Sequence, residues 1–214
     1  MSNLILTFEE TRIIGALIEK EFTTPEYYPL TINYLKNACN QKSSRNPVVN
    51  FDERLIEKVL NKLRDKSLAT LVESRDSRVP KFRQNFSNSL ELSQQETAVL
   101  CVLMLRGPQT PGEIKGRSGR MFEFESLLQV DEVISELMKR ENPMVVKLPK
   151  LPGTKESRYM HLLNGEPNLD FYTQEDENLC ENLDKISELT AEIENLKTEL
   201  QQLRTEFEQF KNQF

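Results

Sequence analysis

The side chains that most often carry metal-binding or acid–base chemistry are few in this sequence. His161 is the only histidine, and the three cysteines, Cys39, Cys101 and Cys180, stand far apart without a CxxC pair. Structural zinc sites and disulfide frameworks need such residues at short, regular spacings. The sequence therefore predicts neither a metal site nor a disulfide, and the cysteines are interpreted as structural. His161 is interpreted as a polar strand residue rather than a general base, because no nucleophile can be assigned to it.

The glycines offer no loop for a nucleotide phosphate. Seven glycines are present, and none belongs to a GxGxxG or GxxxxGK[ST] run. We therefore predict that the protein is not an enzyme and uses no cofactor. The first residues, MSNLILTFEE, lack the charged start and long apolar core of a signal peptide, and no apolar run approaches membrane-spanning length. The sequence predicts a cytoplasmic protein with no membrane contact.

Phosphate binding is the chemistry for which suitable side chains are plentiful. Residues 27–51 contain no acid, and residues 74–85 contain four bases against one acid. Lysine and arginine in such segments bind the phosphates of nucleic acids, so double-stranded DNA is a predicted ligand. The candidate nucleic-acid-binding residues are Lys36, Lys42, Arg45, Arg75, Arg78, Lys81 and Arg83.

The elements that must position these residues come from an internal duplication. Residues 6–25 return 86 positions later as residues 92–111 without a gap. Each copy opens with a capping box, formed by Thr7 with Glu10 and by Ser93 with Glu96. An amphipathic helical pattern follows each box. The sequence predicts two copies of one domain, each beginning with this helix.

Both copies continue with two further helices and a hairpin. In the first copy, helices are predicted at residues 31–39 and from residue 50, and strands at residues 68–72 and 79–86. In the second copy, the helices are predicted from Pro111 to Arg120 and at residues 126–140, and the strands at residues 144–148 and 157–163. Three helices followed by a hairpin is the winged-helix order, in which the hairpin is the wing.

The first copy is 12 residues longer than the second between its first and third helices. Residues 38–48 lie inside this longer interval, and we predict that this loop carries the specific contacts to a partner. The third helix of the first copy is weaker support for DNA binding, because it mixes basic and acidic residues along its length.

The sequence also resembles a known family in several separated runs. These are TPE and YPLT at residues 24–26 and 28–31, ACNQK and RNPV at residues 38–42 and 45–48, TPGE at residues 110–113, and SRYMHL at residues 157–162. Together they resemble the YceH-like family of uncharacterised bacterial proteins, over about residues 4–163. The resemblance implies a tandem winged-helix fold and a link to DNA binding. It supplies no ligand, substrate or catalytic residue.

The C-terminal segment differs in composition from the two copies. Residues 165–214 hold 13 acids and 4 bases, and residues 165–178 are interpreted as an acidic linker. Apolar residues then repeat at alternating spacings of 4 and 3, a coiled-coil seam. Glutamates at the g positions and bases at the e positions favour a parallel homodimer, with one helix folded back on the winged domains as the alternative. The predicted interface residues are Leu189, Ile193, Leu196, Leu200, Leu203, Phe207 and Phe210.

The predicted fold is mainly α with small β-hairpins (α+β): two tandem winged-helix domains and a C-terminal coiled-coil helix. The domains are predicted at residues 1–90 and 91–164, the linker at 165–178 and the coil at 179–214. The predicted function is a dimeric DNA-binding or regulatory protein that uses the first wing and the loop at residues 36–48. A non-enzymatic protein–protein adaptor is the alternative.

Two narrower alternatives concern the basic region of the first copy. The charged hairpin also suits a solvated wing whose charges prevent edge-to-edge aggregation. Tyr27 and Tyr28 can stack on a base, or they can pack against the first helix.

Overall fold

The structure, a computed structural model, describes residues 4–74, 77–150 and 156–167. These residues lie in one compact unit, to which both sequence repeats contribute. The predicted linker beyond Pro167 and the predicted coiled-coil seam from Leu189 onward lie outside the described residues.

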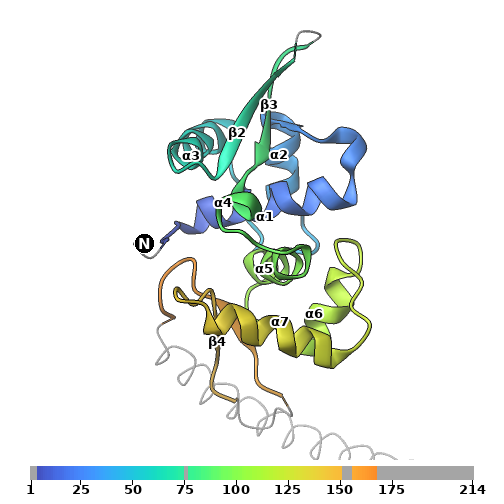
Figure 1. Ribbon diagram of the computed structural model, residues 1–214. Helices are drawn as coiled ribbons and strands as arrows, with labels where there is room; N and C mark the ends of the chain where they lie inside the picture. Colours follow the sequence, from blue (N-terminus) through green and yellow to red (C-terminus); the bar gives the residue numbers. More distant parts are fainter. Residues whose placement is uncertain (1–3, 75–76, 151–155, 168–214) are drawn as a thin grey trace, which may run out of the picture. The chain divides into compact units, whose positions relative to one another are not determined.

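Figure 1 shows a shared arrangement of three α-helices and a hairpin in the two repeats, which are residues 4–90 and 91–167; η1, β1 and α4 belong to the first repeat. In each repeat, three helices are followed by an antiparallel hairpin. The first repeat contains α1 (Phe8–Thr23), η1 (Pro25–Tyr27), β1 (Leu30–Thr31), α2 (Ile32–Cys39), α3 (Glu53–Asp65), β2 (Ala69–Ser74), β3 (Ser77–Gln84) and α4 (Phe86–Ser89). The second contains α5 (Gln94–Arg106), α6 (Pro111–Ser118), α7 (Leu127–Lys139), β4 (Val145–Lys147) and β5 (Tyr159–His161).

The predicted helices and hairpins are therefore confirmed, and so is the mixture of helices with small antiparallel sheets. Most boundaries differ from the prediction by one to three residues. Helix α6 ends at Ser118 rather than Arg120, and the strands of the second hairpin are only three residues long.

Capping side chains set the helix starts. The Thr7 hydroxyl accepts from the Glu10 amide at 3.3 Å, and the Glu10 carboxylate accepts from the Thr7 amide at 2.8 Å. The same reciprocal pair links Ser93 with Glu96 at the start of α5. A third capping box opens α6, where Thr110 precedes Pro111. Such boxes satisfy backbone amides that have no partner within the helix, so they fix where the helix begins.

The sheets are antiparallel. In the first repeat the strand order is β1-β3-β2, with Leu30 opposite Phe82 and Leu71 opposite Phe82 on the other side. In the second repeat, β4 pairs with β5 so that Val145 lies opposite His161. Phe82 is 5% exposed, and it anchors the hairpin of the first repeat to the core.

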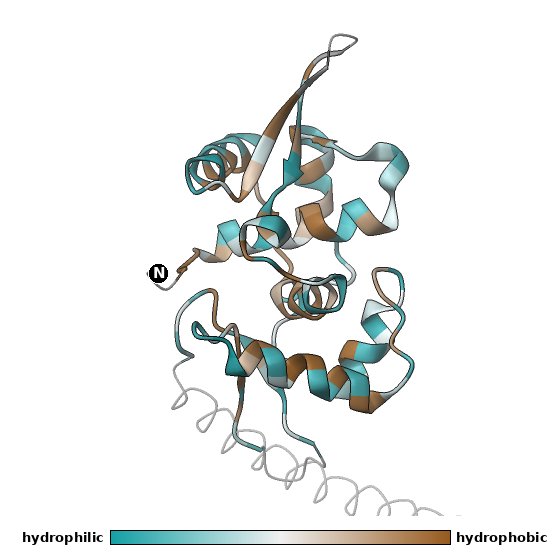
Figure 2. Ribbon diagram, viewed as in Figure 1, coloured by the Kyte–Doolittle hydropathy of each residue, from teal (hydrophilic) through white to brown (hydrophobic). Residues whose placement is uncertain are grey.

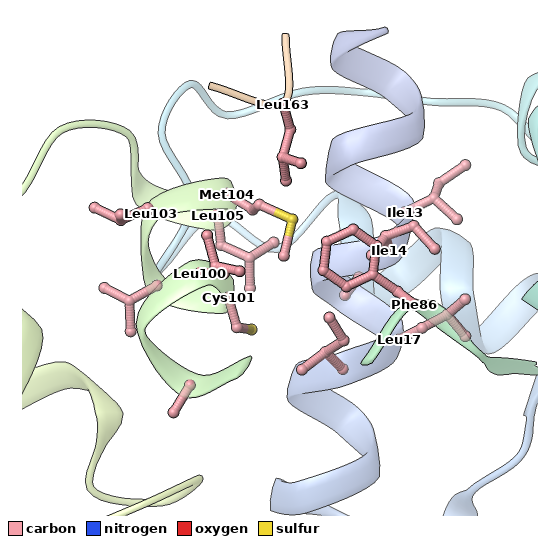
Figure 3. Packing of buried hydrophobic residues seen from close by; sticks show 14 of the residues in the cluster. Ile13, Ile14, Leu17, Phe86, Leu100, Cys101, Leu103, Met104, Leu105 and Leu163 are labelled. Atoms are coloured by element: carbon pink, nitrogen blue, oxygen red, sulfur yellow. The ribbon is translucent and has the colours of Figure 1, made fainter. Parts of the chain in front are cut away.

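The two repeats share one hydrophobic core, centred on α1 and α5. Both helices are buried on all sides over their middle turns, residues 10–18 and 96–105. A helix that is buried all round must pack against neighbours on opposite faces. Figure 3 shows Leu100, Cys101 and Met104 of α5 on the side that faces α1, and Leu17 of α1 beside Phe86. Figure 2 shows that α3 and α7 instead carry both hydrophilic and hydrophobic residues, as expected for helices with one exposed face.

The ends of the described chain also join the repeats. The Leu6 amide donates to the Leu163 carbonyl at 2.7 Å. The Asn164 side-chain amide donates to the Leu6 carbonyl and to the Thr11 hydroxyl, both at 2.9 Å. The segment after β5 is therefore bonded to the start of α1.

Candidate nucleic-acid interface

The hairpin of the first repeat carries part of the predicted basic surface. Side chains alternate between the two faces of a strand, so Lys81 and Arg83 share the face opposite to the buried Phe82. Arg83 is exposed and Lys81 is half-buried. The side chains of Arg75 and Arg78, near the tip, lie outside the part that the structure describes.

Helix α3 carries a second basic surface that the sequence analysis did not isolate. Its buried face consists of Ile56, Val59, Leu60 and Leu63. Arg54, Lys58 and Lys62, at intervals of four residues, lie on the exposed side together with Asn61. Among the described residues, these three cations form no ion pair with an acid.

The two acidic residues at the start of α3 contact other groups of the protein. The Asp52 carboxylate caps the helix by accepting from the Leu55 amide at 2.7 Å. Glu53 pairs with Lys36 of α2 at 2.6 Å. The acids at the helix start are therefore paired, whereas the cations Arg54, Lys58 and Lys62 are exposed, as are the acids Glu57 and Asp65 of the same helix.

Lys36 thus serves a contact between α2 and α3, and its charge is offset by Glu53. Of the predicted residues in the loop, Lys42 is exposed. The structure brings Lys81 and Arg83 together on one strand face. It places Lys36 on α2 and Lys42 in the loop after it.

Arg45 contradicts its predicted role. It is 6% exposed, and its Nη2 lies 2.5 Å from the Glu19 carboxylate. Its Nε and Nη2 donate to the Ala38 carbonyl at 3.0 and 2.9 Å, and its Nη1 donates to the Ser44 carbonyl at 2.9 Å. A guanidinium whose donors are engaged in this way is not available to a phosphate. Arg45 is therefore a structural residue that fixes the loop to α1.

The rest of the long loop is also bound to the protein. The Asn46 amide donates to the Leu105 carbonyl of α5 at 2.8 Å. Arg12, fully buried in α1, donates to the Pro47 carbonyl at 2.8 Å and to the Cys39 carbonyl at 3.3 Å. Much of the polar bonding in residues 38–48 thus holds the loop against α1 and α5.

The two tyrosines have different environments. The Tyr28 hydroxyl accepts from the Gln84 amide at 2.6 Å, and burial, together with the charge of Glu21, raises the pKa of Tyr28. Packing is thus the alternative that fits Tyr28. Tyr27 is 57% exposed and stacks on Tyr34, with ring centroids 5.5 Å apart. An exposed aromatic pair of this kind can receive a further flat group.

Comparison with known proteins places this sequence in a family. A family model described as a protein of unknown function, DUF480, matches residues 6–154. The chain belongs to this family. Its relatives carry the name UPF0502, and one from Koribacter versatilis is 52% identical over 160 residues, covering 75% of this chain and 74% of that protein. Others come from Opitutus terrae, at 52% over 162 residues (75% and 70%), and Geobacter sulfurreducens, at 48% over 167 residues (78% and 75%).

The prediction of a family of uncharacterised bacterial proteins is thereby confirmed, under the name UPF0502. The matched region includes α3, the first hairpin and the long loop, and it ends before β5. None of the helices in the described residues is both long and apolar enough to span a membrane.

The histidine and two of the cysteines of this UPF0502 protein are buried. Burial lowers the pKa of His161 to about 4, so the ring is neutral near pH 7, and Nδ1 has no hydrogen-bond partner. Burial raises the pKa of Cys39 to about 12 and also raises the pKa of Cys101. Both described cysteines are fully buried free thiols, in agreement with the structural role predicted for them. Within the described ranges, no group of three or more His, Cys, Asp or Glu residues is placed to hold a metal ion.

Proposed function

We propose that this UPF0502 protein is a non-enzymatic, DNA-binding regulatory protein built from two winged-helix domains. In this proposal α3 of the first repeat enters the major groove, and the hairpin β2–β3 lies along the neighbouring backbone. The predicted coiled-coil seam would join two copies in parallel and present two such surfaces to two half-sites. The order of three helices and a hairpin, found in both repeats, supports the winged-helix assignment.

The observation that carries the proposal is the exposed stripe on α3. Arg54, Lys58 and Lys62 repeat at one-turn intervals, and no acid within the described residues pairs with them. Arginine reads guanine edges, asparagine reads adenine, and lysine binds phosphate. With Asn61 between the cations, the stripe combines groups suited to base edges and to the backbone. Lys81 and Arg83 on the hairpin add two further phosphate contacts.

The second repeat supports a different role. On α7, Leu127 is 47% exposed and Leu128 is 73% exposed. Glu132 and Glu136 are exposed on the same helix. An apolar and acidic helix repels DNA and suits a protein partner. The second candidate function is therefore an adaptor in which α7 binds protein, and it is compatible with DNA binding by the first repeat.

The test is a titration of the full-length protein with duplex DNA of mixed sequence at two salt concentrations. The variant Arg54→Ala/Lys58→Ala/Lys62→Ala removes the α3 stripe. If the three cations contact phosphates or bases, affinity falls at least about tenfold and the salt slope decreases by about 2–3. The matched control is Lys139→Ala/Lys147→Ala/Lys150→Ala, which removes three exposed charges from the second repeat and changes affinity by less than about threefold.

Two results would overturn the DNA proposal. One is the absence of salt-dependent binding by the parent protein at low salt. The other is an equal loss in both triple variants, which would mean that net charge rather than the α3 surface determines binding. In the first case, Leu128→Lys becomes the informative variant, because it disrupts the exposed apolar residue on which the adaptor function rests.

A further inference from the structure

A groove of about 540 Å³ opens between the two repeats, where α1, α5 and α6 end. One wall consists of the last turns of α1 and residues 41–44 of the long loop. The other consists of Arg106 at the end of α5, and of Arg117, Arg120 and Met121 in and after α6. The volume lies within the range typical of small-molecule pockets, about 300–1,000 Å³.

The charge of this groove is strongly one-sided. Five cations line it: Lys20, Lys42, Arg106, Arg117 and Arg120. The single carboxylate in the lining, Glu19, is bound to the buried Arg45 at 2.5 Å. Its distance to Lys20 is 3.9 Å, at the limit of an ion pair. Most of the positive charge in the groove is therefore not offset by the lining itself.

A partner just outside the groove offsets only part of this charge. Arg117 pairs with Glu113 at 3.3 Å, but the same carboxylate also pairs with Arg158 at 2.6 Å. Arg120 donates to the Thr23 carbonyl at 3.1 Å, so it reaches from the second repeat to the first. Lys42 and Arg106 form no ion pair with any described acid.

The cations also repel one another. Burial lowers the pKa of Arg106, and the neighbouring charges of Arg117 and Arg45 lower it further, while Glu19 acts in the opposite direction. Like charges gathered in a partly buried place destabilise one another unless an anion joins them. Bases in the last turn of a helix offset its negative end. Offsetting the helix end explains one cation at the end of each helix. It does not explain Lys42, which lies in the loop.

The loop wall is held in place before any ligand arrives. Arg45 bonds to the Ala38 and Ser44 carbonyls and to Glu19, and Asn46 bonds to Leu105 across the repeats. Ser44 has a φ of 60°, a left-handed conformation that a non-glycine residue adopts at a cost. Gln41, Ser43 and Ser44 also line the groove and add uncharged donors. Such a preformed wall lowers the entropy that a ligand must lose on binding.

From the convergence of these five cations from both repeats on one groove of small-molecule size, we infer that it binds a small phosphate-bearing ligand with two or more negative charges. The ligand would contact the loop and α1 of the first repeat together with α5 and α6 of the second, and would thus stabilise their association. This site is separate from the α3 stripe and does not depend on DNA binding.

The test uses the full-length protein, with pyrophosphate and adenosine diphosphate as probes and sodium chloride of equal ionic strength as the reference. Calorimetric titration and thermal unfolding are measured for the parent and for Lys42→Ala/Arg117→Ala/Arg120→Ala. Binding in the groove gives the parent a saturable titration and raises its Tm by about 2–4 °C at high occupancy. The groove variant loses both. Stronger binding of adenosine diphosphate than of pyrophosphate indicates a nucleotide, whereas equal binding indicates the phosphate moiety alone.

Two controls keep the result decisive. Lys139→Ala/Lys147→Ala/Lys150→Ala removes the same number of exposed charges elsewhere and retains binding. Lys42→Ala alone changes an exposed side chain and weakens binding at least about threefold. The inference is overturned if neither probe acts beyond sodium chloride, or if both triple variants lose binding equally. It is also overturned if the groove variant weakens only duplex-DNA binding, because the cations would then belong to a DNA surface.

Discussion

The Cys101 thiol donates to the Gly15 carbonyl, with Sγ 3.4 Å from the oxygen, and the two residues are 86 positions apart. That separation equals the offset between the sequence repeats, so Gly15 and Cys101 hold equivalent positions in α1 and α5. The two copies of the first helix therefore pack against each other through the same position of each. Such a contact resembles the self-complementary interface of a symmetric dimer, formed here within one chain.

Gly15 is required by the close approach of these helices. A Cβ added there would lie 2.9 Å from Leu105 Cδ2 and 3.3 Å from Met104 Cβ, inside a buried contact. We expect Gly15→Val to lower the free energy of unfolding by about 2 kcal/mol or more, because overpacking outweighs the gain in helix propensity. Urea unfolding followed by circular dichroism measures the change.

Gly116 provides the matched control. It lies in α6, is exposed, and a Cβ added there would meet nothing within 4 Å. Gly116→Ala should raise the free energy of unfolding by about 0.5–1 kcal/mol through helix propensity alone. If Gly15→Val were as well tolerated as Gly116→Ala, the close packing of α1 on α5 would be wrong.

Because Arg45 is buried and paired with Glu19, we expect its substitution to lower stability strongly. The sequence alone suggests that Arg45 is a surface residue. Its guanidinium is fully buried, and Arg45→Met leaves Glu19 and the Ala38 and Ser44 carbonyls without their donor. We expect a loss of about 3 kcal/mol or more in the free energy of unfolding, as for other broken buried pairs. Chemical denaturation gives this value directly.

The neighbouring Lys42 is the control for that measurement. Lys42→Met changes an exposed side chain of the same loop and should alter stability by no more than about 0.5 kcal/mol. Similar stabilities for the two variants would contradict the structural role of Arg45. The comparison also bears on binding experiments, because a double change of Lys42 and Arg45 would unfold the loop as well as remove charge.

The sequence predicts local features well and spatial groupings poorly. The capping boxes at Thr7 and Ser93 predict helix starts because their hydrogen bonds span only three residues. The role of Arg45 depends on Glu19, 26 positions away, and no local pattern signals that pair. The basic groove joins Lys20, Lys42, Arg106 and Arg117 from four separate segments, so only the folded chain brings them together.

The α3 stripe is neither as easily predicted as a capping box nor as hidden from the sequence as the basic groove. Its residues are close in sequence, but a count of charges along the helix gives a near balance and hides the stripe. Sorting the same residues by helical face separates Arg54, Lys58 and Lys62 from Ile56 and Val59. The sequence therefore does indicate that these three cations share a face, once its residues are arranged with the helical period of 3.6.

His161 predicts a pH dependence of stability. Its folded pKa of about 4 lies below the value of about 6.5 expected in the unfolded chain, so the unfolded state binds a proton first as the pH falls. The contribution of His161 to the free energy of unfolding is complete above about pH 6.5 and is lost progressively as the pH falls to about 4. We expect stability to fall by roughly 2–3 kcal/mol over this range through this residue. Urea unfolding at pH 7, 5.5 and 4.5 measures the fall.

His161→Met isolates this contribution from that of the carboxylates. Nδ1 has no hydrogen-bond partner, so the substitution breaks no bond at that atom and removes the titrating group. The variant should show a shallower loss of stability between pH 7 and 4.5 than the parent. Parallel curves for the two proteins would mean that folding does not change the pKa of His161.

The buried thiols predict resistance to modification in the native protein. Cys39 and Cys101 are fully buried, and burial raises the pKa of Cys39 to about 12 and also raises that of Cys101. In a Cys180→Ser variant at pH 8, both remaining thiols should react with dithionitrobenzoate at least about a hundredfold more slowly than in guanidinium chloride. The reagent needs a thiolate and access to it, and the folded core limits both. Rapid reaction of Cys101 in the native protein would mean that the contact between α1 and α5 opens readily, since this thiol lies within it.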